Sequence, residues 1–168
     1  MSAGIEHRRV KRLLLSGKRQ MGEIMNATTS KVPRHLWIVG IIAVLWNAIG
    51  AFDYAATQFR MESYMSQFTP EQLEYFYGFP AWAVASWALA VWGSLLGSLS
   101  LLLRKAWAVW LFGLALVAMA LTFLYNFVLS DGLSMMGTGG AIFTAVIWAI
   151  AIFLFFYARA MARRGVLR

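Results

Sequence analysis

Asp53 is the residue with the clearest chemical potential, because it is the one charge inside the long apolar stretches of this sequence. Trp46 and Gly50 precede it at helical spacing, and Tyr54 follows it directly. An ionised Asp at the centre of a membrane helix costs about 2.5–3.5 kcal/mol, and intramembrane charges usually mark ion pathways or binding sites. Asp53 lies near one end of its stretch, where that cost falls. Two interpretations stay open: a binding or coupling site, or an interfacial carboxylate hydrogen-bonded to loop residues.

Three further polar side chains lie at some depth in the apolar stretches, namely Asn47, Thr122 and Asn126. Amide and hydroxyl groups in such positions either join two helices, with about 1 kcal/mol for each hydrogen bond, or contact a substrate. We favour hydrogen bonds between helices. The candidates for a binding or coupling site are Asp53, Asn47, Tyr54, Trp46 and Asn126.

The remaining residues offer little catalytic chemistry. Cysteine is absent, which excludes thiol nucleophiles, disulfides and cysteine-type zinc or iron-sulfur ligation. The two histidines, His7 and His35, lie outside the apolar stretches, so haem held by two transmembrane histidines is excluded as well. No serine-histidine-acid group, phosphate loop or pair of intramembrane carboxylates can be assembled. We therefore expect a protein that is not an enzyme and that holds no metal or cofactor.

Four long apolar stretches must position these groups. Apolar residues make up 61% of the chain and charged residues 13%, against roughly 45–50% and 25% in soluble proteins. A bilayer core of about 30 Å requires roughly 20 apolar residues per helix, and residues 36–57, 79–103, 106–129 and 138–157 satisfy this requirement. Uniformly apolar segments of this length must be helices rather than barrel strands. The sequence predicts an all-α bundle of four transmembrane helices, with its membrane domain at residues 36–158.

Basic residues orient this bundle. Of the fifteen Lys and Arg, eight precede the first stretch, two lie between the second and third, four follow the fourth, and only Arg60 lies on the opposite side. Because Lys and Arg are retained in the cytoplasm, both termini are expected there. The net charge of +8 is thus explained by membrane flanks, and we expect no nucleic-acid partner.

The two flanks of the membrane domain are basic, at residues 1–35 and 159–168. The N-terminal flank has apolar residues at helical spacing among Lys and Arg, which is typical of a helix resting on anionic lipid. A disordered basic tail and translation starting at Met25 are the alternatives. The apolar positions are Val10, Leu13, Leu14, Met21 and Ile24.

Small residues form two stripes that would let helices approach closely in lipid. The second stretch contains the longer stripe, which includes a GxxxG pair, and the fourth contains a strict four-residue repeat. Both stripes favour packing within the bundle, with a homo-oligomer or a larger membrane complex as the alternative. Their members are Ala83, Ser86, Ala90, Gly93, Gly97 and Ser100 in the second stretch, and Gly137, Ala141, Ala145 and Ala149 in the fourth.

The loop between the first two stretches contains a helix start signal. Thr69 precedes Pro70, and Gln72 follows three positions after Thr69, as in a capping box with proline at the first helical position. We expect a short helix at residues 70–77, lying on the bilayer surface or over the mouth of the bundle.

A resemblance to a known family covers about residues 36–129. It is carried by LWNAIGAFDY at 45–54, YM at 64–65, FTPEQ at 68–72 and FPAW at 79–82. In these segments the chain resembles a family of small, mostly proteobacterial four-helix membrane proteins that are often labelled sugar transporters. The resemblance implies a multi-pass protein of the bacterial cytoplasmic (inner) membrane, with Asn47, Asp53, Pro80 and Trp82 as pattern positions, but it implies no defined substrate.

Two functions are compatible with these residues. The first is a non-catalytic accessory component that packs into a membrane complex through its small-residue stripes, which the scarcity of interior polar groups favours. The second is a small-solute transporter, of a sugar type or coupled to a cation, acting as an oligomer with Asp53 as the coupling site. A sugar needs several hydrogen-bonding partners near the midplane, and the stretches offer few. We favour the accessory component.

Overall fold

The computed structural model describes residues 14–18 and 32–168, which belong to two units, 1–32 and 33–168. In the first unit residues 14–18 are helical, and Leu14 and Leu15 are exposed. The rest of the expected amphipathic segment, and the alternative start at Met25, lie outside the described residues.

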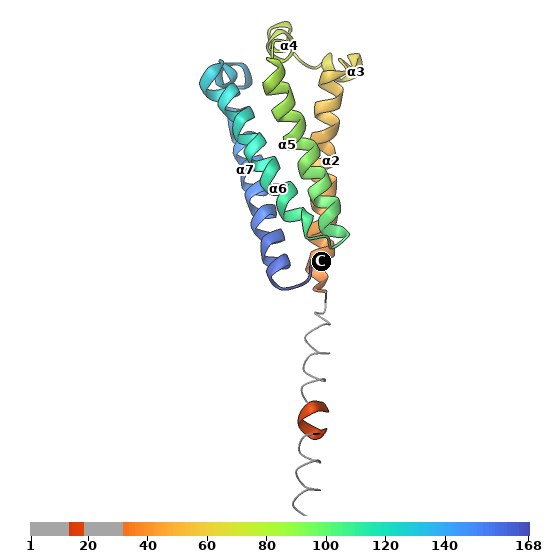
Figure 1. Cartoon of the computed structure of the whole chain (residues 1–168). Coiled ribbons are helices and arrows are strands. Elements are labelled where there is room, and N and C mark those ends of the chain that lie inside the picture. The colour runs from red at the N-terminus through yellow and green to blue at the C-terminus, as the bar shows by residue number, and fades with distance from the viewer. Residues whose placement is uncertain (1–13, 19–31) are drawn as a thin grey trace, which may run out of the picture. The chain divides into compact units, whose positions relative to one another are not determined.

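The second unit is built from four long helices, labelled α2, α5, α6 and α7 in Figure 1, each long and apolar enough to cross a membrane. They are α2 (Arg34–Gln58), α5 (Ala81–Leu102), α6 (Trp107–Leu124), which continues as the π-helix η1 (Tyr125–Leu129), and α7 (Gly132–Arg163). Two short helices, α3 (Glu62–Met65) and α4 (Pro70–Tyr77), join α2 to α5. No strand occurs in the described part of the chain. The predicted all-α bundle of four membrane-length helices is confirmed.

The short helix α4 has the bounds expected from its start signal. The Thr69 hydroxyl accepts a hydrogen bond from the Gln72 backbone N–H at 3.3 Å, and the Gln72 side chain accepts one from the Thr69 N–H at 3.1 Å. This reciprocal pair satisfies two donors that a helix start leaves unbonded.

The bundle has two chemically distinct ends. The basic end contains the start of α2, the turn at Arg104 and Lys105, and the end of α7. The acidic end contains α3, α4 and the link from η1 to α7, with Glu62, Glu71, Glu74 and Asp131.

Three helices end in the same backbone motif, in which one residue adopts a left-handed conformation just after the helix. These residues are Arg60, Arg104 and Gly165, with φ of 49°, 58° and 67°. After each of them the chain turns back and its N–H groups bond to the last helical carbonyls, as in Lys105 N–H to Ser100 O at 2.8 Å and Val166 N–H to Met161 O at 3.0 Å. The motif ends the helices sharply, so α5 and α6 are antiparallel neighbours.

Helix α5 packs most closely against α6, and the small-residue stripe on α5 makes this approach possible. Ala83, Ser86, Ala90, Gly93 and Gly97 are buried, and Ser100 is half-buried. An added Cβ on Gly93 would lie 3.4 Å from Ala115 Cβ, and one on Gly97 would lie 3.0 Å from the Phe112 ring, both on α6. The stripe on α5 therefore packs within this chain.

Helix α7 packs more loosely, and its stripe is placed differently from the expectation of internal packing. Ala145 and Ala149 are exposed, Ala141 is half-buried, and Gly137 is exposed at a kink with φ 63° and ψ −173°. The expected start of the fourth span at residue 138 coincides with the residue after this kink, although helical residues already begin at Gly132.

The segment expected to form a basic tail, 159–168, is part of the folded bundle. Residues up to Arg163 belong to α7, and Val166 and Leu167 are buried. The Arg168 N–H donates to Arg104 O at 2.7 Å, and the Ala106 N–H donates to Arg168 O at 3.0 Å. These bonds attach the end of the described chain to the turn between α5 and α6.

Candidate functional site

Asp53 lies on the last two turns of α2, near the acidic end, and is half-buried. The Tyr64 hydroxyl donates a hydrogen bond of 2.5 Å to Asp53 Oδ1. Tyr64 belongs to α3, which the left-handed turn at Arg60 folds back beside the end of α2. Its ring also contacts Phe52, with centroids 5.7 Å apart. Asp53 thus has the geometry of a carboxylate bonded to the connecting segment.

The environment of Tyr64 favours its neutral form. Burial, the hydrogen bond to Asp53 and the negative charge of that carboxylate together raise the pKa of Tyr64 to about 12, with burial as the largest cause. The phenol therefore remains a donor throughout the physiological pH range, and the contact between α2 and α3 persists there.

The two aromatic candidates beside Asp53 point to other helices. Tyr54 packs edge-on against Trp87 of α5, with ring centroids 5.1 Å apart, and Trp46 contacts Phe143 of α7 at 6.1 Å. Asp53 binds α3, so the three side chains meet three different elements. The structure does not bring them together around one space.

The deeper polar groups each join two elements. The Asn47 amide donates to Ser98 Oγ of α5 at 2.9 Å, and it also donates to Ala43 O on its own helix at 2.9 Å. The Thr122 hydroxyl of α6 lies 3.0 Å from Ser86 Oγ of α5. These contacts are the hydrogen bonds between helices that the polar spacing favours.

Asn126 belongs to a second polar cluster, at the acidic end, which the sequence did not indicate. The Tyr75 hydroxyl of α4 donates to Asn126 Oδ1 at 2.8 Å and lies 2.9 Å from Ser130 Oγ. Burial raises the pKa of Tyr75. Gly132 lies against this cluster, since an added Cβ would lie 2.7 Å from the Tyr75 hydroxyl and would also meet Asn126 O.

This second cluster fixes α4 over the link between α6 and α7. The Gln72 amide adds a bond of 3.2 Å to Met135 O of α7. The capping signal at Thr69 could locate α4 in the sequence, but the docking of Tyr75 depends on the π-helical turn at Tyr125–Leu129, which has no simple sequence signal.

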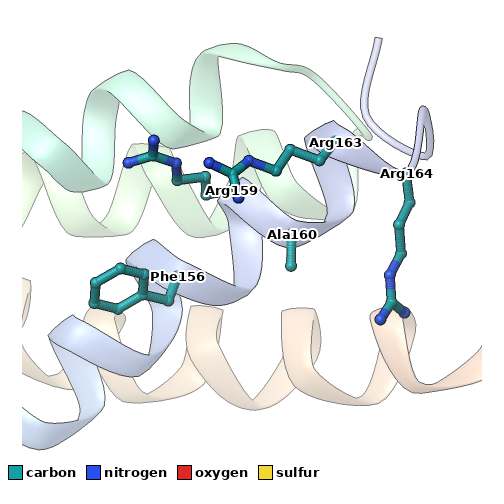
Figure 2. Close-up of a pocket in the computed structure, with 5 residues that line it drawn as sticks. All are labelled: Phe156, Arg159, Ala160, Arg163 and Arg164. Atoms are coloured by element: carbon teal, nitrogen blue, oxygen red, sulfur yellow. The ribbon is translucent and has the colours of Figure 1, made fainter.

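An open pocket of about 620 Å³ lies at the basic end, away from Asp53 and Tyr75. Figure 2 shows its lining, which comes entirely from the last turns of α7 and the residue after them: Phe156, Arg159, Ala160, Arg163 and Arg164. Among the described residues, no group of three or more His, Cys, Asp or Glu could hold a metal ion. The side chains that line the pocket are thus three arginines and two apolar residues.

No family model, curated protein or solved structure matches this chain. The function is therefore inferred from the positions, contacts and exposure of the described residues.

Proposed function

We propose that the protein is a non-catalytic membrane component that packs against the helices of a larger membrane complex. The observation that carries this proposal is the exposure of Ala145 and Ala149 on α7, one turn apart on a face that has no partner within the described chain. Lipid tails are as apolar as leucine, so helices associate in a bilayer mainly through close van der Waals contact between small residues. A smooth face on α7 offers such contact to a partner helix.

The comparison with α5 supports the same proposal. The stripe on α5 is buried against α6, so its small residues are accounted for by the fold. The face on α7 is not, and α7 is the least enclosed of the four long helices. The interior polar groups Asn47, Thr122 and Asn126 are bonded within the bundle, which leaves few groups for a solute.

The orientation and location are parts of this proposal. The basic end faces the cytoplasm, because Arg104, Lys105, Arg159, Arg163 and Arg164 lie there and Lys and Arg are retained on that side. The membrane is the bacterial cytoplasmic membrane, in agreement with the family resemblance of residues 36–129.

Purification of the complex from native membranes tests the proposal. Wild-type protein in mild detergent is expected to migrate with partner subunits, and Ala145→Leu or Ala149→Leu is expected to lose them while keeping the wild-type unfolding midpoint. Ala120→Leu is the matched control, since Ala120 is an exposed position of α6 and the same increase in volume there should leave the complex intact. A complex that survives both leucine substitutions in α7 would refute this use of the face.

Transport is the second candidate, and one observation favours it. The half-buried Asp53 carboxylate accepts a single side-chain hydrogen bond, from Tyr64, and is not held in a salt bridge among the described residues. It could therefore exchange a proton or cation during a cycle. Asp53→Asn should abolish substrate-dependent flux in reconstituted vesicles if the protein is such a transporter, whereas an accessory component has no flux to lose.

A further inference from the structure

We propose that the pocket at the basic end of α7 binds the phosphate of an anionic phospholipid. This inference rests on the proposed membrane location, and it assigns a defined site to the expected contact with anionic lipid. The charge of the pocket and its apolar border each contribute to it.

The pocket concentrates positive charge on one helix. Arg159 and Arg163 are four residues apart, and Figure 2 shows their guanidinium groups extending to the same side of α7, whereas Arg164 extends to the other side. Like charges at this spacing repel one another and weaken a helix. A phosphate between the two guanidinium groups would remove this repulsion and accept several charge-assisted hydrogen bonds.

The described part of the bundle has no acidic side chain that could serve instead. Its Asp and Glu residues are Asp53, Glu62, Glu71, Glu74 and Asp131, and all of them lie at or near the acidic end. Neither Arg159 nor Arg163 forms a hydrogen bond or salt bridge with another described residue. No Asp or Glu side chain of the described bundle therefore compensates their charge.

The apolar border of the pocket distinguishes a lipid from a soluble phosphate. Phe156 lines the pocket and is 59% exposed, and Phe153 and Ile152, further towards the middle of α7, are 54% and 42% exposed. A free phosphate would contact only the guanidinium groups. A phospholipid would place its phosphate there and its acyl chains along Phe156, Phe153 and Ile152, so both halves of the surface would be used.

Lipid binding to the full-length protein tests the site. Native mass spectrometry and thermal unfolding are followed in a neutral detergent during titration with phosphatidylglycerol or phosphatidylcholine. Phosphatidylglycerol is expected to bind more tightly. The double variant Arg159→Gln, Arg163→Gln is expected to weaken that binding by about 25-fold, at about five-fold for each cation lost near the lipid surface.

Two controls make the result specific. Lys105→Gln removes a positive charge from the same end but outside the pocket, and it should change phosphatidylglycerol binding by no more than about two-fold. The double variant Arg159→Lys, Arg163→Lys keeps both charges and should lie between wild type and the glutamine variant, because lysine lacks the planar two-pronged donor of arginine. It also keeps the test valid if loss of charge impairs folding.

Three results would overturn the site: equal binding of the two lipids, unchanged binding in the glutamine variant, or displacement of the lipid by inorganic phosphate at no more than the concentration of the lipid. The last result would identify a soluble phosphate as the ligand. Absence of partner subunits from the wild-type protein, with intact lipid selectivity, would contradict only the accessory function. A wild-type complex without lipid selectivity would contradict only this site.

Discussion

Gly97 and Gly93 form one GxxxG pair, yet the packing of α5 against α6 predicts opposite effects when each is changed to alanine. The Cβ of alanine at position 97 would lie 3.0 Å from Cδ1 and Cε1 of Phe112, whose side chain is 2% exposed and enclosed on all sides. The Cβ of alanine at position 93 would lie 3.4 Å from Ala115 Cβ, which is an ordinary van der Waals contact.

Both substitutions gain about 0.8–1 kcal/mol, because alanine is a better residue than glycine inside a helix. Gly97→Ala must also displace the buried Phe112 ring, and overpacking of this kind costs about 1–3 kcal/mol. We therefore expect Gly93→Ala to raise the free energy of unfolding by up to about 1 kcal/mol and Gly97→Ala to lower it by up to about 2 kcal/mol.

The measurement is equilibrium unfolding of the purified protein in mixed micelles, followed by helical circular dichroism. Gly50→Ala on α2 is the control for helix propensity alone, since no atom lies within 4 Å of an added Cβ there. Phe112→Leu should restore part of the stability lost in Gly97→Ala. If Gly97→Ala is as stable as Gly93→Ala, the close approach of α5 to α6 at Phe112 is wrong.

Further predictions concern the acidic end and the orientation of the bundle. The folded pKa of Tyr64 is about 12, against an ordinary value of 10. The contribution of its neutral phenol to stability is therefore complete below pH 10 and is lost between pH 10 and 12. The difference in phenolate absorbance between the wild-type protein and Tyr64→Phe should titrate near pH 12, and a midpoint near 10 would contradict this. Asp53→Asn should lower that midpoint only in part, because burial is the larger cause of the shift. Gly132→Ala should destabilise the acidic end by about 2 kcal/mol or more, detectable as faster amide exchange, because the new Cβ would overlap the backbone carbonyl of Asn126, which must then shift. Reporter fusions after Lys105 should read cytoplasmic and those near Ser66 periplasmic, and the opposite readings would reverse the proposed topology.

Packing between helices decided which small-residue stripe is buried and which is exposed. The two stripes look alike in the sequence, with small residues every three or four positions. Only the helix rotations show that Gly93 and Gly97 face α6 while Ala145 and Ala149 face outward. Spacing determines which residues share a face, but the direction of that face depends on bulky neighbours such as Phe112 on another helix.

Partners of single polar residues were likewise decided by the tertiary structure. The sequence placed Asp53 near the end of its span and offered a loop contact as one interpretation, but it could not identify Tyr64. That pairing depends on the left-handed turn at Arg60, a conformation that non-glycine residues rarely adopt and that the residue type does not indicate. The contact of Tyr75 with Asn126 depends in the same way on a π-helical turn.

The sequence by itself determined the all-α class, the four membrane-length helices and the short helix at Pro70–Tyr77. These properties follow from local physics: a bilayer selects apolar segments of about 20 residues, and a capping box satisfies backbone donors within four residues. The tertiary structure alone decided that the segment after α7 folds onto the turn at Arg104, and that Tyr75 of α4 docks on Asn126. Such arrangements join residues far apart in the chain, and no local pattern records the distance between them.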